Sequence, residues 1–121
     1  MAKILIIDDD SQIPDMLGQT LEREGYEVVR ASNGREGMKI NRKTPVDLII
    51  TDIIMPEKEG IETILELKRD FPHIKIIAIS GGGHIEAEDY LYIAENIGAH
   101  RTFTKPIKRD ELLKAASELL E

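Results

Sequence analysis

Several side chains that can bind metal or transfer phosphate stand directly behind apolar runs in this sequence. The stretch "ILIIDDD", residues 4–10, runs four large apolar residues into three carboxylates. Two carboxylates about 4 Å apart repel one another by roughly 4 kcal/mol at an effective dielectric constant near 20. Open water or a cation must offset that repulsion. Further along, a carboxylate follows an apolar run at Asp52, a hydroxyl follows one at Ser80, and an ammonium stands at Lys105.

The types of these side chains predict a particular chemistry. Oxygen-only clusters suit hard cations, and Mg²⁺ is the cation that keeps several waters in a small open site. A carboxylate such as Asp52 can attack phosphorus and form an aspartyl phosphate. Phosphoryl transfer needs little beyond positioning and positive charge on the non-bridging oxygens, which Lys105 and the metal would supply. The hydroxyl of Ser80 would add a hydrogen bond.

The elements that must position these groups alternate along the chain. Apolar, β-branched runs predict five strands, at Lys3–Ile7, Glu27–Ala31, Val46–Thr51, Ile74–Ile79 and Arg101–Thr104. Helical segments are predicted at Ser11–Glu24, Gly34–Arg42, Gly60–Asp70, Ile85–Asn96 and Arg109–Leu120. This alternation predicts an α/β fold: a doubly wound, five-stranded parallel sheet with strand order 2-1-3-4-5.

Apolar spacing within the helical segments predicts which side of each helix packs on the sheet. Ile13, Leu17 and Leu21 follow one another at a spacing of four in the first segment. In the third segment the apolar stripe is Ile61, Ile64 and Leu65, and Lys68 continues it.

The predicted strand order brings the polar groups together. Strands one, three, four and five are neighbours in it, at about 4.8 Å spacing. Their carboxyl ends carry the acids at residues 8–10, then Asp52, Ser80 and Lys105. Ligands of such sheets bind beyond the carboxyl ends of the strands, so one crevice is expected to hold all of these side chains.

Composition excludes several other classes of protein. The chain has 121 residues, 41% of them hydrophobic, which predicts one domain with a real core. Its net charge of −7 argues against direct nucleic-acid binding and against docking on anionic lipid. No apolar run is long enough to span a membrane, and the absence of cysteine fits a reducing cytoplasm.

The chain resembles the response-regulator receiver domains, the single-domain CheY-like kind with the flavodoxin/CheY-like fold, over residues 1–121. The stretches that carry the resemblance are "ILIIDDD", "DLIITDIIMP" followed by a glycine, "IIAIS" and "GAHRTFTKPI". Each of them is weak alone, but in this order, each at a predicted strand end, they are specific.

The resemblance implies a role for individual residues. It makes Asp52 the phospho-acceptor, Lys105 the lysine of the site and Ser80 the switch hydroxyl. The implied Mg²⁺ ligands are the carboxylates of Asp9 and Asp52, the backbone carbonyl of Ile54 and, through water, Asp8. Asp10 matches a variable position of the family and is left outside the site.

One position departs from the family pattern. Many receivers carry an aromatic switch residue three positions before the lysine, and here that position is Thr102. The adjacent Phe103 falls where the family usually has an inward aliphatic residue. An aromatic switch is therefore not expected, and Ser80 would signal through backbone movement.

The function expected from the resemblance is that of a phospho-acceptor in a two-component pathway. A sensor histidine kinase or phosphotransfer protein would donate the phosphoryl group. A downstream protein would bind the face of the helix at 85–96, the strand at 101–104 and the helix at 109–120. The chain would be a stand-alone receiver or a domain excised from a longer protein.

Two other functions remain open. One is an interaction module that keeps the fold and is not phosphorylated. The other is a Mg²⁺-dependent phosphohydrolase with Asp52 as nucleophile; such enzymes generally need a general acid two residues further on, where this chain has Ile54.

Overall fold

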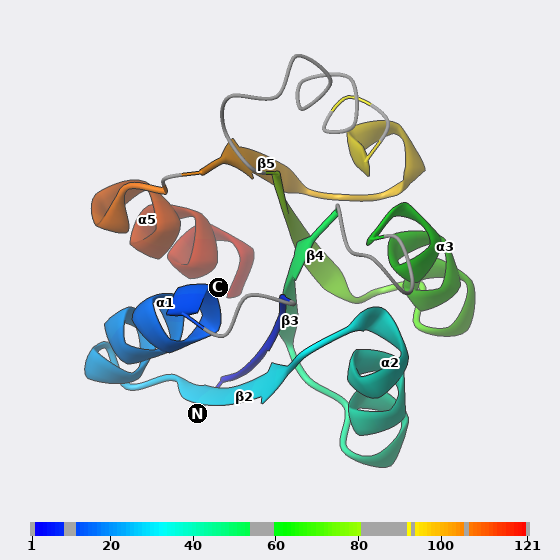
Figure 1. Cartoon of the computed structure of the whole chain (residues 1–121), viewed down its shortest axis with the longest axis horizontal. Coiled ribbons are helices and arrows are strands. Elements are labelled where there is room, and N and C mark those ends of the chain that lie inside the picture. The colour runs from blue at the N-terminus through cyan, green and yellow to red at the C-terminus, as the bar shows by residue number, and fades with distance from the viewer. Residues whose placement is uncertain are drawn as a thin grey trace.

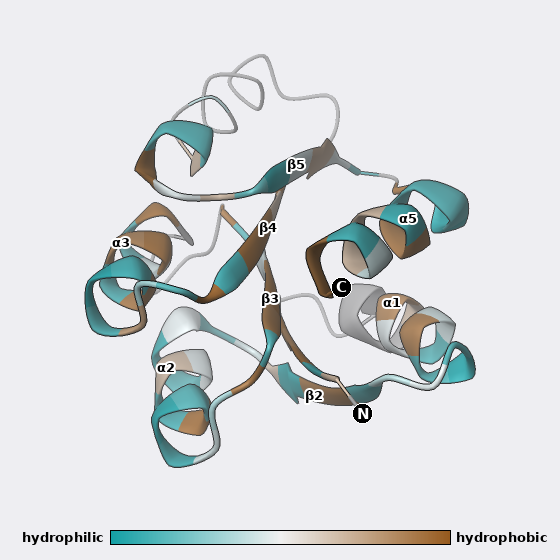
Figure 2. Cartoon of the chain, turned by 180° about the vertical axis from the view of Figure 1, so that it is seen from behind, coloured by the Kyte–Doolittle hydropathy of each residue, from teal (hydrophilic) through white to brown (hydrophobic). Residues whose placement is uncertain are grey.

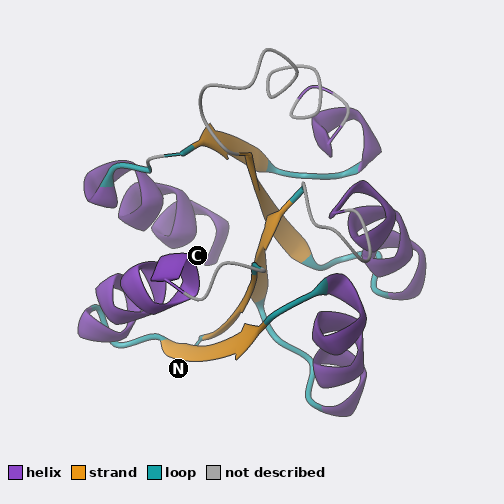
Figure 3. Cartoon of the chain, in the orientation of Figure 1, coloured by secondary structure: helices purple, strands orange, loops and turns teal. Residues whose placement is uncertain are grey.

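A computed structural model describes residues 2–8, 12–53, 60–80, 92, 94–105 and 107–120. They build a five-stranded parallel sheet with the order β2-β1-β3-β4-β5 (Figure 1; Figure 3). The strands are β1 (Lys3–Ile7), β2 (Glu27–Ala31), β3 (Leu48–Asp52), β4 (Lys75–Ser80) and β5 (Arg101–Thr104). The predicted fold class and strand order are confirmed.

Helices cover both faces of the sheet. They are α1 (Gln12–Arg23), α2 (Gly34–Lys43), α3 (Gly60–Asp70) and α5 (Arg109–Leu120). The helices α1 and α5 lie together on one face, and α2 and α3 lie on the other (Figure 1). Residues 92 and 94–97, which precede β5, are helical as well.

Alternation along the strands divides the interior into two cores. Leu5 and Ile7 of β1 pack toward α2 and α3, whereas Ile4 and Ile6 pack toward α1 and α5. All four side chains are at most 1% exposed. Strands β3 and β4 are hydrophobic over most of their length, while the helices carry both polar and apolar residues (Figure 2). A sheet buried on both faces leaves its strand ends as the natural place for polar chemistry.

Three predicted strands have the predicted bounds. The predicted strands Val46–Thr51 and Ile74–Ile79 begin later, at Leu48 and Lys75, and each ends one residue later, at Asp52 and Ser80. Val46 and Ile74 were assigned to strands because they are apolar, and both are buried, at 6% and 7% exposure. Their backbones, however, lie outside β3 and β4. The Val46 N–H donates to Oδ1 of Asn41 at 2.8 Å, and the Ile74 N–H donates to the carbonyl of Phe71 at 3.0 Å. Burial thus extends beyond the hydrogen-bonded ladder at both places.

The helices agree with the prediction within one residue wherever they are described. The predicted helix at 85–96 lies mostly outside the described residues, and its described end extends to Ile97. The predicted apolar stripe of α3 is wrong at Leu65, which is 50% exposed. The buried residues are Ile64 and Leu67, one helical turn apart, and this turn places Leu65 toward solvent.

One more pair of hydrogen bonds joins β4 to the residue that directly precedes β5. The His100 N–H donates to the carbonyl of Ile76 at 2.8 Å, and the Ile76 N–H donates to Nδ1 of His100 at 3.2 Å. The imidazole therefore takes the place of a backbone carbonyl where β5 has not yet begun.

Candidate functional site

Four strand ends meet at the carboxyl edge of the sheet. In the β1–β3 pair Ile7 lies opposite Thr51, so Asp8 and Asp52 come next on neighbouring strands. Ser80 ends β4, and Lys105 directly follows β5. We call Asp8, Asp52, Ser80 and Lys105 the carboxyl-edge site.

Lys105 joins two acids that are distant in the sequence. Its Nζ donates to Oδ2 of Asp52 at 2.9 Å and to Oδ2 of Asp8 at 3.1 Å. Asp8 is 3% exposed and Asp52 is 5% exposed, whereas the side chain of Lys105 is 20% exposed. A largely buried triad of this kind is held by charge-assisted hydrogen bonds, which are the strong ones in proteins.

The two acids keep the lysine charged. Burial alone lowers the pKa of Lys105, but the hydrogen bonds and negative charges of Asp52 and Asp8 outweigh it, and the net pKa is raised. The group is therefore an ammonium at neutral pH. An ammonium fixed beside a carboxylate is the arrangement that can neutralise further negative charge arriving at that carboxylate.

Backbone hydrogen bonds hold three residues of the carboxyl-edge site. The Asp8 N–H donates to the carbonyl of Ala31 at 3.1 Å. The Lys105 N–H donates to the carbonyl of Ser80 at 2.8 Å, which continues the β4–β5 ladder by one residue. The described part of the site therefore stands at the ends of hydrogen-bonded strands.

Ser80 lies at the same edge with unused hydrogen-bonding capacity. The residue is fully buried, and among the described residues its Oγ has no hydrogen-bond partner. Buried hydroxyls are normally satisfied, so an unpaired one at a strand end is consistent with a group that bonds a ligand.

The donor set fits a hard divalent cation. Asp8 and Asp52 contribute two negative charges and Lys105 one positive charge, so the described part of the site carries a net charge of −1. All of its acceptor atoms are oxygens, which Mg²⁺ prefers. Within the described ranges no group of three or more His, Asp or Glu side chains gathers as a metal site. The predicted ligands Asp9 and Ile54 lie outside those ranges.

The predicted switch position is engaged by a polar neighbour. The hydroxyl of Thr102 donates to Oε1 of Glu95 at 2.9 Å and thereby links β5 to the helical residues before it. Sequence reasoning missed Glu95, since the contact depends on how that helix is placed on the sheet. It also missed Thr51, whose hydroxyl donates to the backbone carbonyl of Asp52 at 3.0 Å. A lone hydroxyl in the apolar run "DLIITD" was its only signal.

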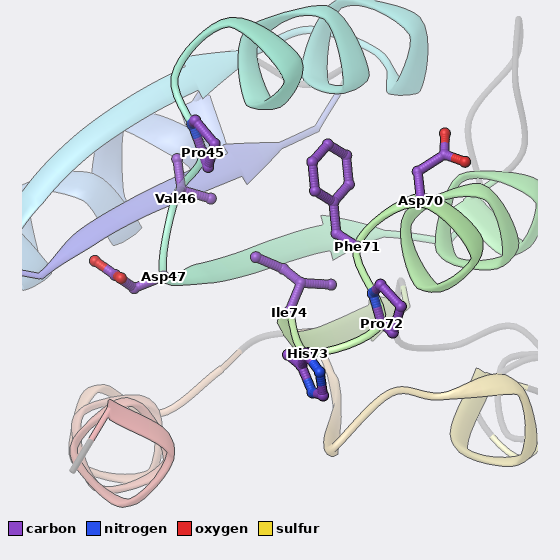
Figure 4. A pocket seen from close by; sticks show the side chains of 8 residues that line it. All are labelled: Pro45, Val46, Asp47, Asp70, Phe71, Pro72, His73 and Ile74. Atoms are coloured by element: carbon purple, nitrogen blue, oxygen red, sulfur yellow. The ribbon is translucent and has the colours of Figure 1, made fainter.

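A separate cavity of about 420 Å³ opens at the opposite, amino edge of the sheet (Figure 4). Its lining comes from the α2–β3 and α3–β4 connections: Pro45, Val46, Asp47, Asp70, Phe71, Pro72, His73 and Ile74. Its two acids have partners. Asp70 pairs with Arg42 at 3.2 Å and with Arg69 at 2.9 Å, and Asp47 accepts the Lys3 N–H at 2.8 Å.

No helix in the described part of the chain is both long and apolar enough to cross a membrane.

Comparison with known proteins agrees with this arrangement. The family described as "Response regulator receiver domain" matches residues 4–117. The chain is 33% identical over 120 residues to the transcriptional regulatory protein GlrR of Escherichia coli K12, covering 99% of this chain and 26% of that protein. It is 31% identical to sporulation initiation phosphotransferase F of Bacillus subtilis, covering 98% and 93% of the two chains.

Solved structures agree as well. The crystal structure of a response regulator receiver domain protein from Clostridium thermocellum superposes with a TM-score of 0.90 at 34% identity, covering 99% of this chain and 94% of that one. Some relatives are much longer, since the chain spans about a quarter of the length of GlrR. Sequence, fold and the Asp8–Asp52–Lys105 geometry lead to one conclusion: the chain belongs to the response regulator receiver domain family of two-component systems.

Proposed function

We propose that this receiver accepts a phosphoryl group on Asp52 in a Mg²⁺-dependent reaction and so switches the loops after β4 and β5. The observation that carries the proposal is the position of Lys105, whose ammonium bridges Asp8 and Asp52. A carboxylate that is buried, ionic and next to a fixed cation is suited to nucleophilic attack on phosphorus.

The donor would be a phosphohistidine on a sensor histidine kinase or a phosphotransfer protein. A carboxylate oxygen of Asp52 forms a bond to phosphorus while the phosphorus–nitrogen bond of the donor breaks. The electron pair of that bond stays on the imidazole nitrogen. Lys105 is within 2.9 Å of the acceptor carboxylate and would bind a non-bridging oxygen of the incoming group. The protein would therefore catalyse only its own phosphorylation and dephosphorylation.

Mg²⁺ is proposed to be held by Asp8 through water and directly by Asp52, with Asp9 and the carbonyl of Ile54 as the further protein ligands. When bound, the ion supplies positive charge for the phosphoryl oxygens. The chain's own contribution is to hold the acceptor carboxylate and the ammonium in fixed positions. The net negative charge of the described acids and lysine favours a cation there.

The new phosphate would then change the partners within the site. A phosphoryl group carries a charge of about −1.5 to −2 at neutral pH and has three acceptor oxygens. It would compete with Asp8 for Lys105 and would offer a partner to the unpaired hydroxyl of Ser80. Both residues stand at the ends of β4 and β5, so the shift would reach the loops that follow.

The proposed output surface is the face of the helix before β5, β5 itself and α5. Its described part includes Tyr92, which is 69% exposed, and the ion pair of Arg101 with Glu118 at 3.7 Å, which joins β5 to α5. Thr102 and its partner Glu95 belong to the same elements. A downstream protein would distinguish the two states of this face. The cytoplasmic location expected from the cysteine-free sequence stays a prediction.

The experiment is incubation with acetyl phosphate and Mg²⁺, followed by intact mass measurement. Wild type is expected to gain one phosphoryl group, and Asp52→Asn and a magnesium-free sample are expected to gain none. No mass gain in wild type would contradict the proposal and favour an interaction module that is not phosphorylated. Sustained turnover of free phosphate esters would favour a phosphohydrolase.

A further inference from the structure

The peptide unit that follows Asp52 is held from both sides. Its carbonyl oxygen accepts the hydroxyl of Thr51 at 3.0 Å. Its N–H, which belongs to Ile53, donates to the carbonyl of Ile79 at 2.9 Å. One bond comes from a side chain of β3 and the other from the end of β4. Because both groups belong to one rigid amide plane, the two bonds together fix the orientation of that plane.

Thr51 carries a hydroxyl group in an otherwise apolar environment. It is fully buried and lies opposite Ile7 of β1 and Ala78 of β4. Successive side chains of a strand point to opposite faces, so Thr51 shares the face of Ile49, and the side chain of Asp52 points to the other face. Thr51 therefore reaches the acceptor through the backbone of its own strand.

A valine would fill the same volume without a polar atom. Burying a hydroxyl is unfavourable unless it is hydrogen-bonded, and here the bond is to the carbonyl of the acceptor residue. Core packing alone would favour the methyl group. The presence of an oxygen at this position therefore indicates a role in orienting the backbone.

We infer that Thr51 is a positioning residue for phosphoryl transfer, acting through the Asp52–Ile53 amide plane. This inference rests on the proposed function. The plane sets the direction of the Asp52 carboxylate toward Lys105 and the path of the chain toward residue 54. Catalytic geometry is sensitive to shifts of about 1 Å, which can change rates by as much as 100-fold.

Two matched pairs of variants test the inference in the full chain. Thr51→Val replaces the hydroxyl of wild type by a methyl group. Thr51→Ser and Thr51→Ala both lack the γ-methyl group and differ from each other only in the hydroxyl. The measured quantity is the rate of phosphorylation at saturating acetyl phosphate and Mg²⁺, followed by intact mass. Thermal unfolding of each variant shows that it is folded.

The phosphorylation rate is expected to depend on the hydroxyl at position 51 and not on the γ-methyl group. Thr51→Val should be phosphorylated about tenfold more slowly than wild type, and Thr51→Ala about tenfold more slowly than Thr51→Ser. Thr51→Ser should stay within about twofold of the wild-type rate. If Thr51 had a purely structural role, Thr51→Ser and Thr51→Ala would instead have similar rates, because both lack the γ-methyl group. If Thr51→Val fails to fold, the comparison of Thr51→Ser with Thr51→Ala alone tests the inference.

Equal rates with and without the hydroxyl, or rates that follow the methyl group, would overturn the inference while leaving the proposed function intact. A wild type that takes up no phosphate would overturn both, and that failure is distinguishable because it appears before any variant is compared.

Discussion

The two edges of the sheet present polar groups in different ways. At the carboxyl edge Asp8 and Asp52 share the single ammonium of Lys105, and the buried hydroxyl of Ser80 has no described partner. At the amino edge there is an open cavity of about 420 Å³, but its acids are paired. Asp70 alone contacts two arginines.

The pairing of the polar groups therefore distinguishes the amino-edge cavity from the carboxyl-edge site. The two acids of the amino-edge cavity are already held by Arg42, Arg69 and the Lys3 N–H, so they are less available to a ligand. A strand-end cluster with excess negative charge and an unpaired hydroxyl favours the binding of a cation and of further hydrogen-bonding groups. The carboxyl edge therefore carries the groups that the proposed phosphoryl transfer would use.

The largest effect is expected from removing the ammonium. Lys105→Ala should slow phosphorylation of Asp52 by about 100-fold, because a preorganised cation that stabilises transferring charge contributes on that scale. Rates with acetyl phosphate, followed by intact mass, would measure it. Lys108→Ala is the matched control: this exposed lysine lies three residues further on and should leave the rate unchanged. Similar losses in both variants would mean that net charge, and not position, matters.

An intermediate effect is expected at the amino edge, and on stability only. Ile74 is 7% exposed and forms part of the cavity wall. Ile74→Ala should lower the free energy of unfolding by about 2–5 kcal/mol and leave the phosphorylation rate of the folded protein within about twofold. Urea denaturation and the acetyl phosphate assay would show this. The exposed neighbour His73, changed to Ala, should alter stability by less than about 0.5 kcal/mol.

The smallest effect is expected from protonating His100. Burial lowers the pKa of His100, and the positive charges of Lys68, Lys75 and Arg101 lower it further. Nδ1 must also stay unprotonated to accept the Ile76 N–H. The unfolded chain therefore binds this proton more readily, so stability is lost as the pH falls from the unfolded value near 6.5 through the lower folded value.

The comparison of denaturation midpoints at pH 7 and pH 5 would measure this loss. His100→Asn places an amide oxygen where Nδ1 accepts, without a titrating group, and should lose less stability on acidification than wild type. His73→Asn, at an exposed position of the same edge, should behave like wild type. Equal losses in all three proteins would contradict the expected role of His100.

The sequence was sufficient to predict that Asp8, Asp52 and Lys105 meet. Parallel strands end at one edge, so residues at the ends of apolar runs converge once the strand order is known. Contacts that depend on how a helix packs could not be predicted in the same way. The hydrogen bond of Thr102 with Glu95 and the exposure of Leu65 both follow from helix rotation, which apolar spacing defines only roughly.

Strand limits were predicted least well at residues that are buried but do not form the hydrogen bonds of the sheet. Val46 and Ile74 are as buried as strand residues, yet the Val46 N–H bonds to the side chain of Asn41 in α2 and the Ile74 N–H bonds to the carbonyl of Phe71. The amino-edge cavity arises between these same two connections, and no pattern of residue types indicated it. Its shape is set by the packing of irregular backbone, which has no sequence period.

The bond between Lys105 and Asp8 spans 97 residues of chain. During synthesis the aspartates leave the ribosome long before the lysine that they require. The bond between Lys105 and Asp8 can therefore form only after β5 has docked beside β4. We expect that the proposed phosphorylation of Asp52 would require this last strand to be in place, because Lys105 directly follows it.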